Sequence, residues 1–220
     1  MLGRSRTFDE DVVFVGKTAS PLKSAIVENA KKNGVVLKPR EIEKYYRSIL
    51  ANREIAATVA KIKALGSDAV YFPVDVCDLS ELSEALDFVR KEIGPIEGII
   101  HGAGVIHDKL IRDKTQEQFD AVMRTKVLGA TNLLNATQSD RLKSICFFSS
   151  VAGRTGNSGQ SDYAMANEVL NKLALFEAAS RRESGCNVHS IGWGPGRQVT
   201  KQERRIPALW PGQNKRRPIL

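Results

Sequence analysis

The stretch CFFSSVAGRTGNSGQSDYAMAN, from Cys146 to Asn167, decides how the rest of this chain is interpreted. Residues 144–148 form a short apolar, aromatic-rich run between polar residues, which predicts a buried strand. Ser150 follows at the carboxyl end of this strand, where α/β folds place their chemistry. The stretch therefore predicts that Ser150 belongs to a functional site.

The second half of the stretch predicts a helix with polar side chains on one face. A loop with three glycines leads into this helix, which starts near Ser161 or Asp162. Tyr163 falls in its first turn, and Asn167 lies one turn further along the same face. The strand and the helix together bring a serine, a tyrosine and an asparagine to one end of the fold.

A tyrosine beside a serine hydroxyl and a lysine can donate a proton to a developing alkoxide. Free tyrosine titrates near pH ~10, so a neighbouring cation is needed for this role at neutral pH. Lys126, in the segment TKVLG on the helix before the Ser150 strand, is the candidate cation. Each of these residues also has an ordinary interpretation when it is considered alone. Tyr163 would be a packing residue and Ser150 a turn residue. Lys126 would be a solvated lysine, and Asn167 would be an amide on the helix surface. Only their combined spacing favours catalysis.

This spacing resembles that of the ketoreductases of polyketide synthases, in the short-chain dehydrogenase/reductase superfamily. These have a YxxxN motif and an upstream KxxG motif, so their lysine and asparagine are exchanged relative to ordinary short-chain dehydrogenases. The flanking motifs agree: HGAGVI at 101–106, FSSVAG at 148–153, GNSGQSDYAMAN at 156–167 and WGP at 193–195. The long insertion ending in NREIA, residues 52–56, is most similar to the ketoreductase segment of polyunsaturated fatty acid synthases.

The resemblance implies a Rossmann-like, doubly wound parallel α/β fold over residues 1–195, with a family insertion at about 9–64. It implies NADPH-dependent reduction of a β-ketoacyl thioester, bound to acyl carrier protein, to a β-hydroxyacyl thioester within a megasynthase. Tyr163 would donate the proton, Ser150 would hold the carbonyl oxygen and Lys126 would assist the tyrosine. Asn167 would complete a proton relay through water.

The resemblance also implies a cofactor site. In LGRS, Arg4 and Ser5 match residues that face the 2′-phosphate of NADPH, a task that suits the planar guanidinium fork. Without the resemblance, Arg4 reads as a solvated residue near the terminus. The other matched positions, which otherwise read as a loop carboxylate and a tight turn, are Asp75, Val76, Gly102, Ala103 and Gly104.

The two ends of the chain depart from the family. Relatives have a first strand, a glycine-rich turn and a helix before LGRS, so we expect the fold to lack its first βα unit. We also expect the second and third strands to have nothing to pair with. The alternative function is accordingly a non-catalytic ketoreductase fragment, or half of a split domain that cannot bind cofactor alone.

The remaining elements follow from periodicity and turn signals. Strands are expected at 69–76, 98–101 and 188–192, with helices from Asp78 to Gly94 and from Thr115 to Ala136. Their alternation predicts right-handed βαβ units. In the insertion, residues 40–50 and 53–65 read as amphipathic helices. Ile106-His107-Asp108, at the position of a Leu-Asp-Asp signature in relatives, favours a D-configured product.

The composition limits the classes of protein to which the chain can belong. With 220 residues, 26% of them charged and 42% hydrophobic, the chain suits one globular α/β domain. It shows neither a long apolar run nor a signal-peptide pattern, so we expect a cytoplasmic protein without membrane contact. Its three widely spaced cysteines favour neither a disulfide framework nor a metal site.

The net charge of +8 is concentrated at the carboxyl end. Residues 197–220 hold seven lysines or arginines and one acid, which accounts for +6 of the excess. Residues 196–220 therefore read as a basic, disordered tail, and the domain itself is not expected to bind nucleic acid. Binding through the tail is an alternative that depends on those residues.

Overall fold

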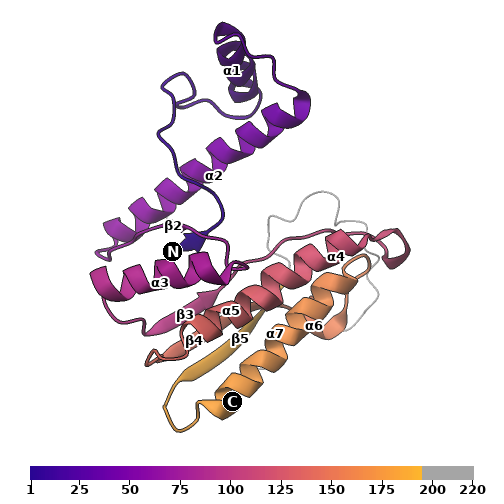
Figure 1. Cartoon of the computed structure of the whole chain (residues 1–220). Helices are drawn as coiled ribbons and strands as arrows, with labels where there is room; N and C mark the ends of the chain where they lie inside the picture. Colours follow the sequence, from indigo (N-terminus) through magenta and orange to yellow (C-terminus); the bar gives the residue numbers. More distant parts are fainter. Residues whose placement is uncertain (195–220) are drawn as a thin grey trace, which may run out of the picture.

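The computed structural model describes residues 1–194 and places a parallel sheet beneath a layer of helices (Figure 1). Three parallel strands lie side by side in the order β3 (Gly98–His101), β4 (Ser144–Ser150) and β5 (Asn187–Trp193). Along β4, alternate residues are buried, as expected for a strand with one packed face. The predicted α/β class and these three predicted strands are confirmed. Pro195 and the tail expected at 196–220 lie outside the described residues.

A second, short sheet corrects the sequence-based expectation. Strand β1 (Leu2–Gly3) pairs in parallel with β2 (Phe72–Pro73), so the expectation that these segments would have nothing to pair with is wrong. In the strand order of this fold class, β1 and β2 are direct neighbours. A further strand would lie between β1 and β3, and so would not come between β1 and β2. The strand expected at 69–76 is also shorter than predicted.

One helical run contacts both the segment that follows β2 and the end of β3. It consists of α4 (Gln116–Met123), a π-helical turn (Arg124–Leu128) and α5 (Gly129–Ala136). The amide of Asn132 donates to the carbonyl of Val76 at 3.0 Å. A Cβ atom added at Gly129 would lie 2.7 Å from Val76 Cγ2 and 3.3 Å from His101 Cε1. The absence of a side chain there lets the helix contact the segments that follow β2 and end β3.

The helices of the main domain cover one face of the β3–β4–β5 sheet (Figure 1). They are α3 (Leu79–Glu92), the α4–α5 run, the short α6 (Ala152–Thr155) and α7 (Ser161–Ser180). Asp78 caps α3 by accepting hydrogen bonds from the backbone N–H groups of Ser80 and Glu81. A single apolar core extends from Val74 near the short sheet to Leu170 on α7. The two sheets therefore belong to one folding unit.

The insertion forms a helical hairpin with a small core of its own. Helix α1 (Ala19–Lys32) packs on α2 (Pro39–Ala64) around the buried side chains of Phe14, Leu22, Ala25, Ile26 and Ile49. The two predicted amphipathic stretches, 40–50 and 53–65, are thus parts of one helix. Over residues 1–194, no helix combines the length and the apolar character that a membrane span requires.

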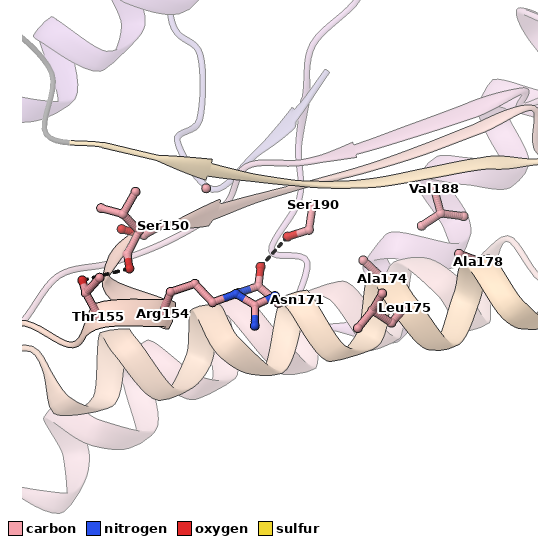
Figure 2. A pocket seen from close by; sticks show the side chains of 11 residues that line it. Ser150, Arg154, Thr155, Asn171, Ala174, Leu175, Ala178, Val188 and Ser190 are labelled. Atoms are coloured by element: carbon pink, nitrogen blue, oxygen red, sulfur yellow. Dashed lines mark hydrogen bonds between the residues drawn. The ribbon is translucent and has the colours of Figure 1, made fainter. Parts of the chain in front are cut away.

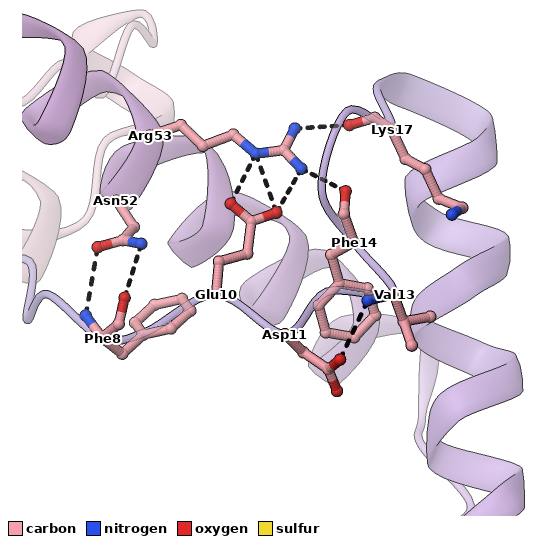
Figure 3. A network of polar contacts seen from close by, with 8 residues as sticks. All are labelled: Phe8, Glu10, Asp11, Val13, Phe14, Lys17, Asn52 and Arg53. Atoms are coloured by element: carbon pink, nitrogen blue, oxygen red, sulfur yellow. Dashed lines mark hydrogen bonds and ion pairs between the residues drawn. The ribbon is translucent and has the colours of Figure 1, made fainter.

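Arg53 organises the loop that enters this hairpin (Figure 3). Its guanidinium forms a double hydrogen-bonded ion pair with Glu10 and donates to the carbonyls of Phe14 at 2.6 Å and Lys17 at 2.5 Å. Asn52, one residue earlier, exchanges two hydrogen bonds with the backbone of Phe8. One turn of α2 therefore fixes the whole entering loop.

Replacing Arg53 with alanine is expected to loosen the hairpin without unfolding the sheet. The variant leaves the Glu10 carboxylate and two carbonyls without a donor, at a local cost of about 2 kcal/mol. Native-state hydrogen exchange in residues 8–64 should become roughly 30-fold faster, while exchange in β3–β5 is unchanged. Arg40→Ala, an exposed change on the same helix, is the control. Equal exchange in the two variants would contradict this role of Arg53.

Candidate active site

One candidate catalytic residue, Ser150, lies at the carboxyl ends of β4 and β5. Ser150 is the last residue of β4, where its hydroxyl accepts a hydrogen bond from the Ala152 N–H at 3.2 Å. The same hydroxyl donates to the carbonyl of Trp193, the last residue of β5, at 3.4 Å. The serine side chain is therefore held at the end of the sheet by its neighbours on both sides.

Lys126 lies within the π-helical turn and is only 4% exposed. Its Nζ donates to the carbonyl of Phe148 at 3.1 Å and lies 5.5 Å from the centre of the Tyr163 ring. Among the described residues, no carboxylate forms an ion pair with it. Burial lowers the pKa of this ammonium from 10.5 to about 8. A buried, unpaired lysine with a lowered pKa is typical of a functional site.

Gly104 makes room for this lysine. A Cβ atom at that position would lie 3.2 Å from Lys126 Cε, tighter than ordinary contact. The π-helical turn that carries Lys126 is itself a feature that often marks functional sites in helices. The sequence predicted the helix and its lysine, but not the π-helical turn.

Tyr163 and Asn167 occupy the first two turns of α7, as predicted. The Asn167 amide donates to the carbonyl of Tyr163 at 2.7 Å. Asn167 is fully buried, and its Oδ1 has no hydrogen-bond partner among the described residues. Leaving a buried acceptor unpaired costs about 1–3 kcal/mol, which marks this oxygen as a position for a water or ligand donor. The alternative reading of Asn167 as a surface amide is wrong.

A buried ion pair that sequence reasoning missed fixes the start of α7. Lys114 donates to Asp162 at 2.9 Å, and their side chains are 4% and 1% exposed. Lys114 also donates to the carbonyl of His107 at 2.6 Å. Nearby, the backbone N–H of Lys109 donates to the carbonyl of Gly159 at 2.9 Å. These contacts attach the segment after β3 to the loop before Tyr163.

His101 supports the helix beneath the site. It is the last residue of β3, it is buried, and its Nε2 lies 2.9 Å from the carbonyl of Lys126. Its ring also packs edge-on against Phe147. Burial, together with the charge of Lys126, lowers the pKa of His101 from 6.5 to about 4. The neutral imidazole is therefore the form that the folded chain favours.

The predicted cofactor residues, apart from Ser5, line one cavity of about 360 Å³. The cavity lies between the end of β1, the segment after β2 and the segment after β3. Ser5 is not among its lining residues; its carbonyl instead accepts a hydrogen bond from the Tyr71 hydroxyl at 2.8 Å. The lining residues are Leu2, Gly3, Arg4, Val74, Asp75, Val76, Gly102, Ala103, Gly104 and Thr125.

This cavity fits an adenine nucleotide in its chemistry. Arg4 is exposed and forms no ion pair among the described residues, so its guanidinium is available to an anion. Gly102 and Gly104 present bare backbone next to Phe148 and Lys126. The cavity and Lys126 are therefore neighbours through Gly104.

A separate cavity of about 400 Å³ lies between β5 and α7 (Figure 2). Ser150 is the only candidate catalytic residue that lines it, and its far end is the apolar group of Leu175, Ala178 and Val188. Ser190 donates to Asn171 across this cavity at 2.7 Å. It extends away from Lys126 and Tyr163, along the edge of β5.

Comparisons with known proteins agree with this geometry. Residues 16–198 match the family model described as "KR domain". The chain is 44% identical over 170 residues to a polyunsaturated fatty acid synthase polypeptide of Thraustochytrium sp., and the match covers 76% of this chain and 6% of that protein. It is thus similar to a small part of a much longer polypeptide.

Two solved structures share the fold. An N-terminal ketoreductase from the macrolactin assembly line superposes with a TM-score of 0.60 at 31% identity, covering 64% of this chain and 29% of that one. A short-chain dehydrogenase from Mycobacterium avium superposes with a TM-score of 0.61 at 24% identity, covering 66% of this chain and 53% of that one. The second likeness concerns the fold alone, and together they confirm the Rossmann-like class.

Replacing Asp162 with asparagine is expected to destabilise the chain by about 3–5 kcal/mol, because the buried Lys114 ammonium loses its counter-charge. Urea denaturation measures this change. The double variant Lys114→Met/Asp162→Leu should recover most of the loss, since it removes both charges. Asp113→Asn, which breaks an exposed pair with Arg112, is the control and should change stability by about 0.5 kcal/mol or less. An Asp162→Asn variant as stable as this control would show that the pair has no structural role.

The stability of the chain is expected to fall as pH decreases from 6.5 to 4. In this range the unfolded chain binds a proton at His101 and the folded chain does not, so acid favours unfolding. The loss attributable to His101 is roughly 3 kcal/mol. Urea titrations at several pH values measure it. His101→Asn should flatten the dependence of stability on pH between 6.5 and 4. The control, His189→Asn, at an exposed position of β5, should retain that dependence. If His101→Asn leaves the dependence unchanged, protonation of His101 is not its cause.

Proposed function

The chain belongs to the family of KR domains, and on that premise we propose that it reduces a β-ketoacyl thioester to a β-hydroxyacyl thioester with NADPH. The observation that carries the proposal is the buried ammonium of Lys126 facing the ring of Tyr163, with no carboxylate pairing it among the described residues. Such an ammonium is costly for the fold, and catalysis explains why it is kept there.

The proton that the reduced ketone needs comes from Tyr163. The ammonium of Lys126, close to the ring, favours the tyrosinate that forms when the hydroxyl gives up its proton. No group of the described chain hydrogen-bonds to the Tyr163 hydroxyl, so its proton is available to a substrate oxygen. Ser150, at the end of β4, is the second hydroxyl that stabilises the negative charge developing on that oxygen.

Asn167 has two tasks in this proposal. Its amide nitrogen fixes the first turn of α7 by donating to the carbonyl of Tyr163. Its unpartnered Oδ1 accepts a hydrogen bond from water, through which a proton returns to the active site. An asparagine suits both tasks because one side chain supplies a donor and an acceptor.

The proposed cofactor, NADPH, supplies the hydride of the reduction. Arg4 would hold its 2′-phosphate, Asp75 and Val76 would lie against the adenine, and the Gly102–Gly104 segment would allow the close passage of its backbone. Ser5 is proposed at the same phosphate, although it lies outside the cavity lining. The proposed substrate carrier is an acyl carrier protein, and the proposed setting is a multidomain synthase, as in the relatives.

A second candidate is a chain that contributes the catalytic residues only together with a further strand. The arrangement of the described strands in two sheets, with the cofactor cavity where they meet, favours this alternative. Titration of the 220-residue chain with NADPH, followed by cofactor fluorescence, separates the two. Binding supports the first candidate. Binding only after an upstream strand and glycine-rich turn are added supports the second.

Replacing Tyr163 with phenylalanine, in the chain extended upstream by that strand and turn, is expected to lower NADPH-dependent β-ketoacyl thioester reduction at least ~100-fold. Folding should not change, because the removed hydroxyl has no partner among the described residues. Tyr45→Phe, the same chemical change on helix α2, is the control. Near-normal turnover by Tyr163→Phe would refute the assigned proton donor.

A further inference from the structure

Arg124 lines a cavity that adjoins the proposed nucleotide site, and neither the motifs nor the comparisons assign it a role. It follows α4 and is the first residue of the π-helical turn, two residues before Lys126. Its side chain lines a cavity of about 550 Å³ together with Arg4, Asp75 and Cys77. Arg4, Asp75 and Thr125 also line the cofactor cavity, so the two cavities adjoin.

The backbone of Arg124 is held in place, which gives its side chain a fixed origin. Its N–H continues the helical pattern by donating to the carbonyls of Ala121 and Asp120. Its carbonyl accepts a contact from the Cys77 thiol at 3.4 Å. The residue therefore bridges the helical run and the segment after β2, and it leaves one rotatable side chain in the cavity.

The described residues that line this cavity carry two guanidinium groups and one carboxylate, that of Asp75, so one positive charge is left without a counter-charge. Neither Arg4 nor Arg124 forms an ion pair within residues 1–194, and Asp75 uses Oδ1 to accept the Cys77 N–H at 2.9 Å. Burial and Asp75 raise the pKa of the Cys77 thiol, whereas the charges of Arg124 and Arg4 oppose this change. Both guanidinium groups therefore lie close enough to the Cys77 thiol to oppose the rise in its pKa.

The Asp75 carboxylate can offset only one of the two positive charges, so the cavity still favours an anionic ligand. A phosphate group is the anion that suits these two arginines best, because each planar guanidinium can bind two of its oxygens. A terminal phosphate offers three oxygens to the two forks, whereas a carboxylate offers two. The cavity is thus suited to a phosphate attached to a group that occupies the adjoining cofactor cavity.

We propose that Arg124 is a second phosphate-binding residue of the nucleotide site, which acts with Arg4 on the 2′-phosphate of an adenine nucleotide. This inference rests on the proposed function for the choice of ligand. It adds a residue that discriminates 2′-phosphorylated nucleotides from those with a free 2′-hydroxyl. It also places the discriminating residue and Lys126 on the same π-helical turn.

The test uses 2′,5′-ADP and 5′-AMP as probes of the 220-residue chain by isothermal titration calorimetry. The chain should bind 2′,5′-ADP more tightly than 5′-AMP. Arg124→Gln should weaken 2′,5′-ADP binding by about tenfold or more and leave 5′-AMP binding unchanged. Arg124→Lys should give an intermediate affinity, because a point charge replaces a fork.

Arg182→Gln is the matched control, since Arg182 is exposed on the loop between α7 and β5, at the other end of the strands. Thermal melts show whether each variant remains folded. Equal binding of the two probes, no binding of 2′,5′-ADP by the parent chain, or identical behaviour of Arg124→Gln and Arg182→Gln would each overturn the inference. None of these measurements requires catalysis. If the upstream-extended chain reduces the thioester but the 220-residue chain binds the two probes equally, only this inference is overturned. If the probes are discriminated but the upstream-extended chain reduces no thioester, only the proposed function is overturned.

Discussion

The close packing of Gly129 against Val76 and His101 is the contact on which the rest of this structure depends. Because a side chain does not fit there, the helical run from α4 to α5 touches the ends of both sheets at once. The same run carries Lys126 at the centre of the site and Arg124 at its edge. A side chain at position 129 would push this helical run away from Val76 and His101, and Lys126 would move with it.

Local patterns made much of this arrangement predictable. The apolar run ending at Ser150, the capped start of α3 at Asp78 and the glycine loop before Tyr163 are short-range signals, and each indicated the right element. The pairing of β1 with β2 was missed because it depends on which strands are neighbours, which the local pattern does not encode. The π-helical turn at Lys126 was missed because its extra residue shifts the apolar pattern at one point only, within a segment that otherwise keeps helical spacing.

Some residues of the candidate site could likewise be predicted from local sequence patterns, and others could not. The spacing of motifs predicted four catalytic residues, Lys126, Ser150, Tyr163 and Asn167. The structure places Lys126 and Asn167 each beside Tyr163. Lys114 and Asp162 form a buried pair between residues 48 apart in the chain, which no local signal announces. Arg124 lies on an exposed helical position, where arginine is ordinary. The role proposed for it depends on Arg4, which lines the same cavity.

Polar groups that weaken the fold gather where the proposed chemistry needs them. Lys126 is buried without a carboxylate partner in the described chain, and the buried Oδ1 of Asn167 has no donor there. Each costs stability that the common core of the two sheets must offset. The cofactor cavity lies where those sheets meet, with Arg4 after one and the Gly102–Gly104 segment after the other. A nucleotide that contacts both Arg4 and the Gly102–Gly104 segment would therefore connect the two sheets. Nucleotide binding and the relative position of the sheets are then thermodynamically linked.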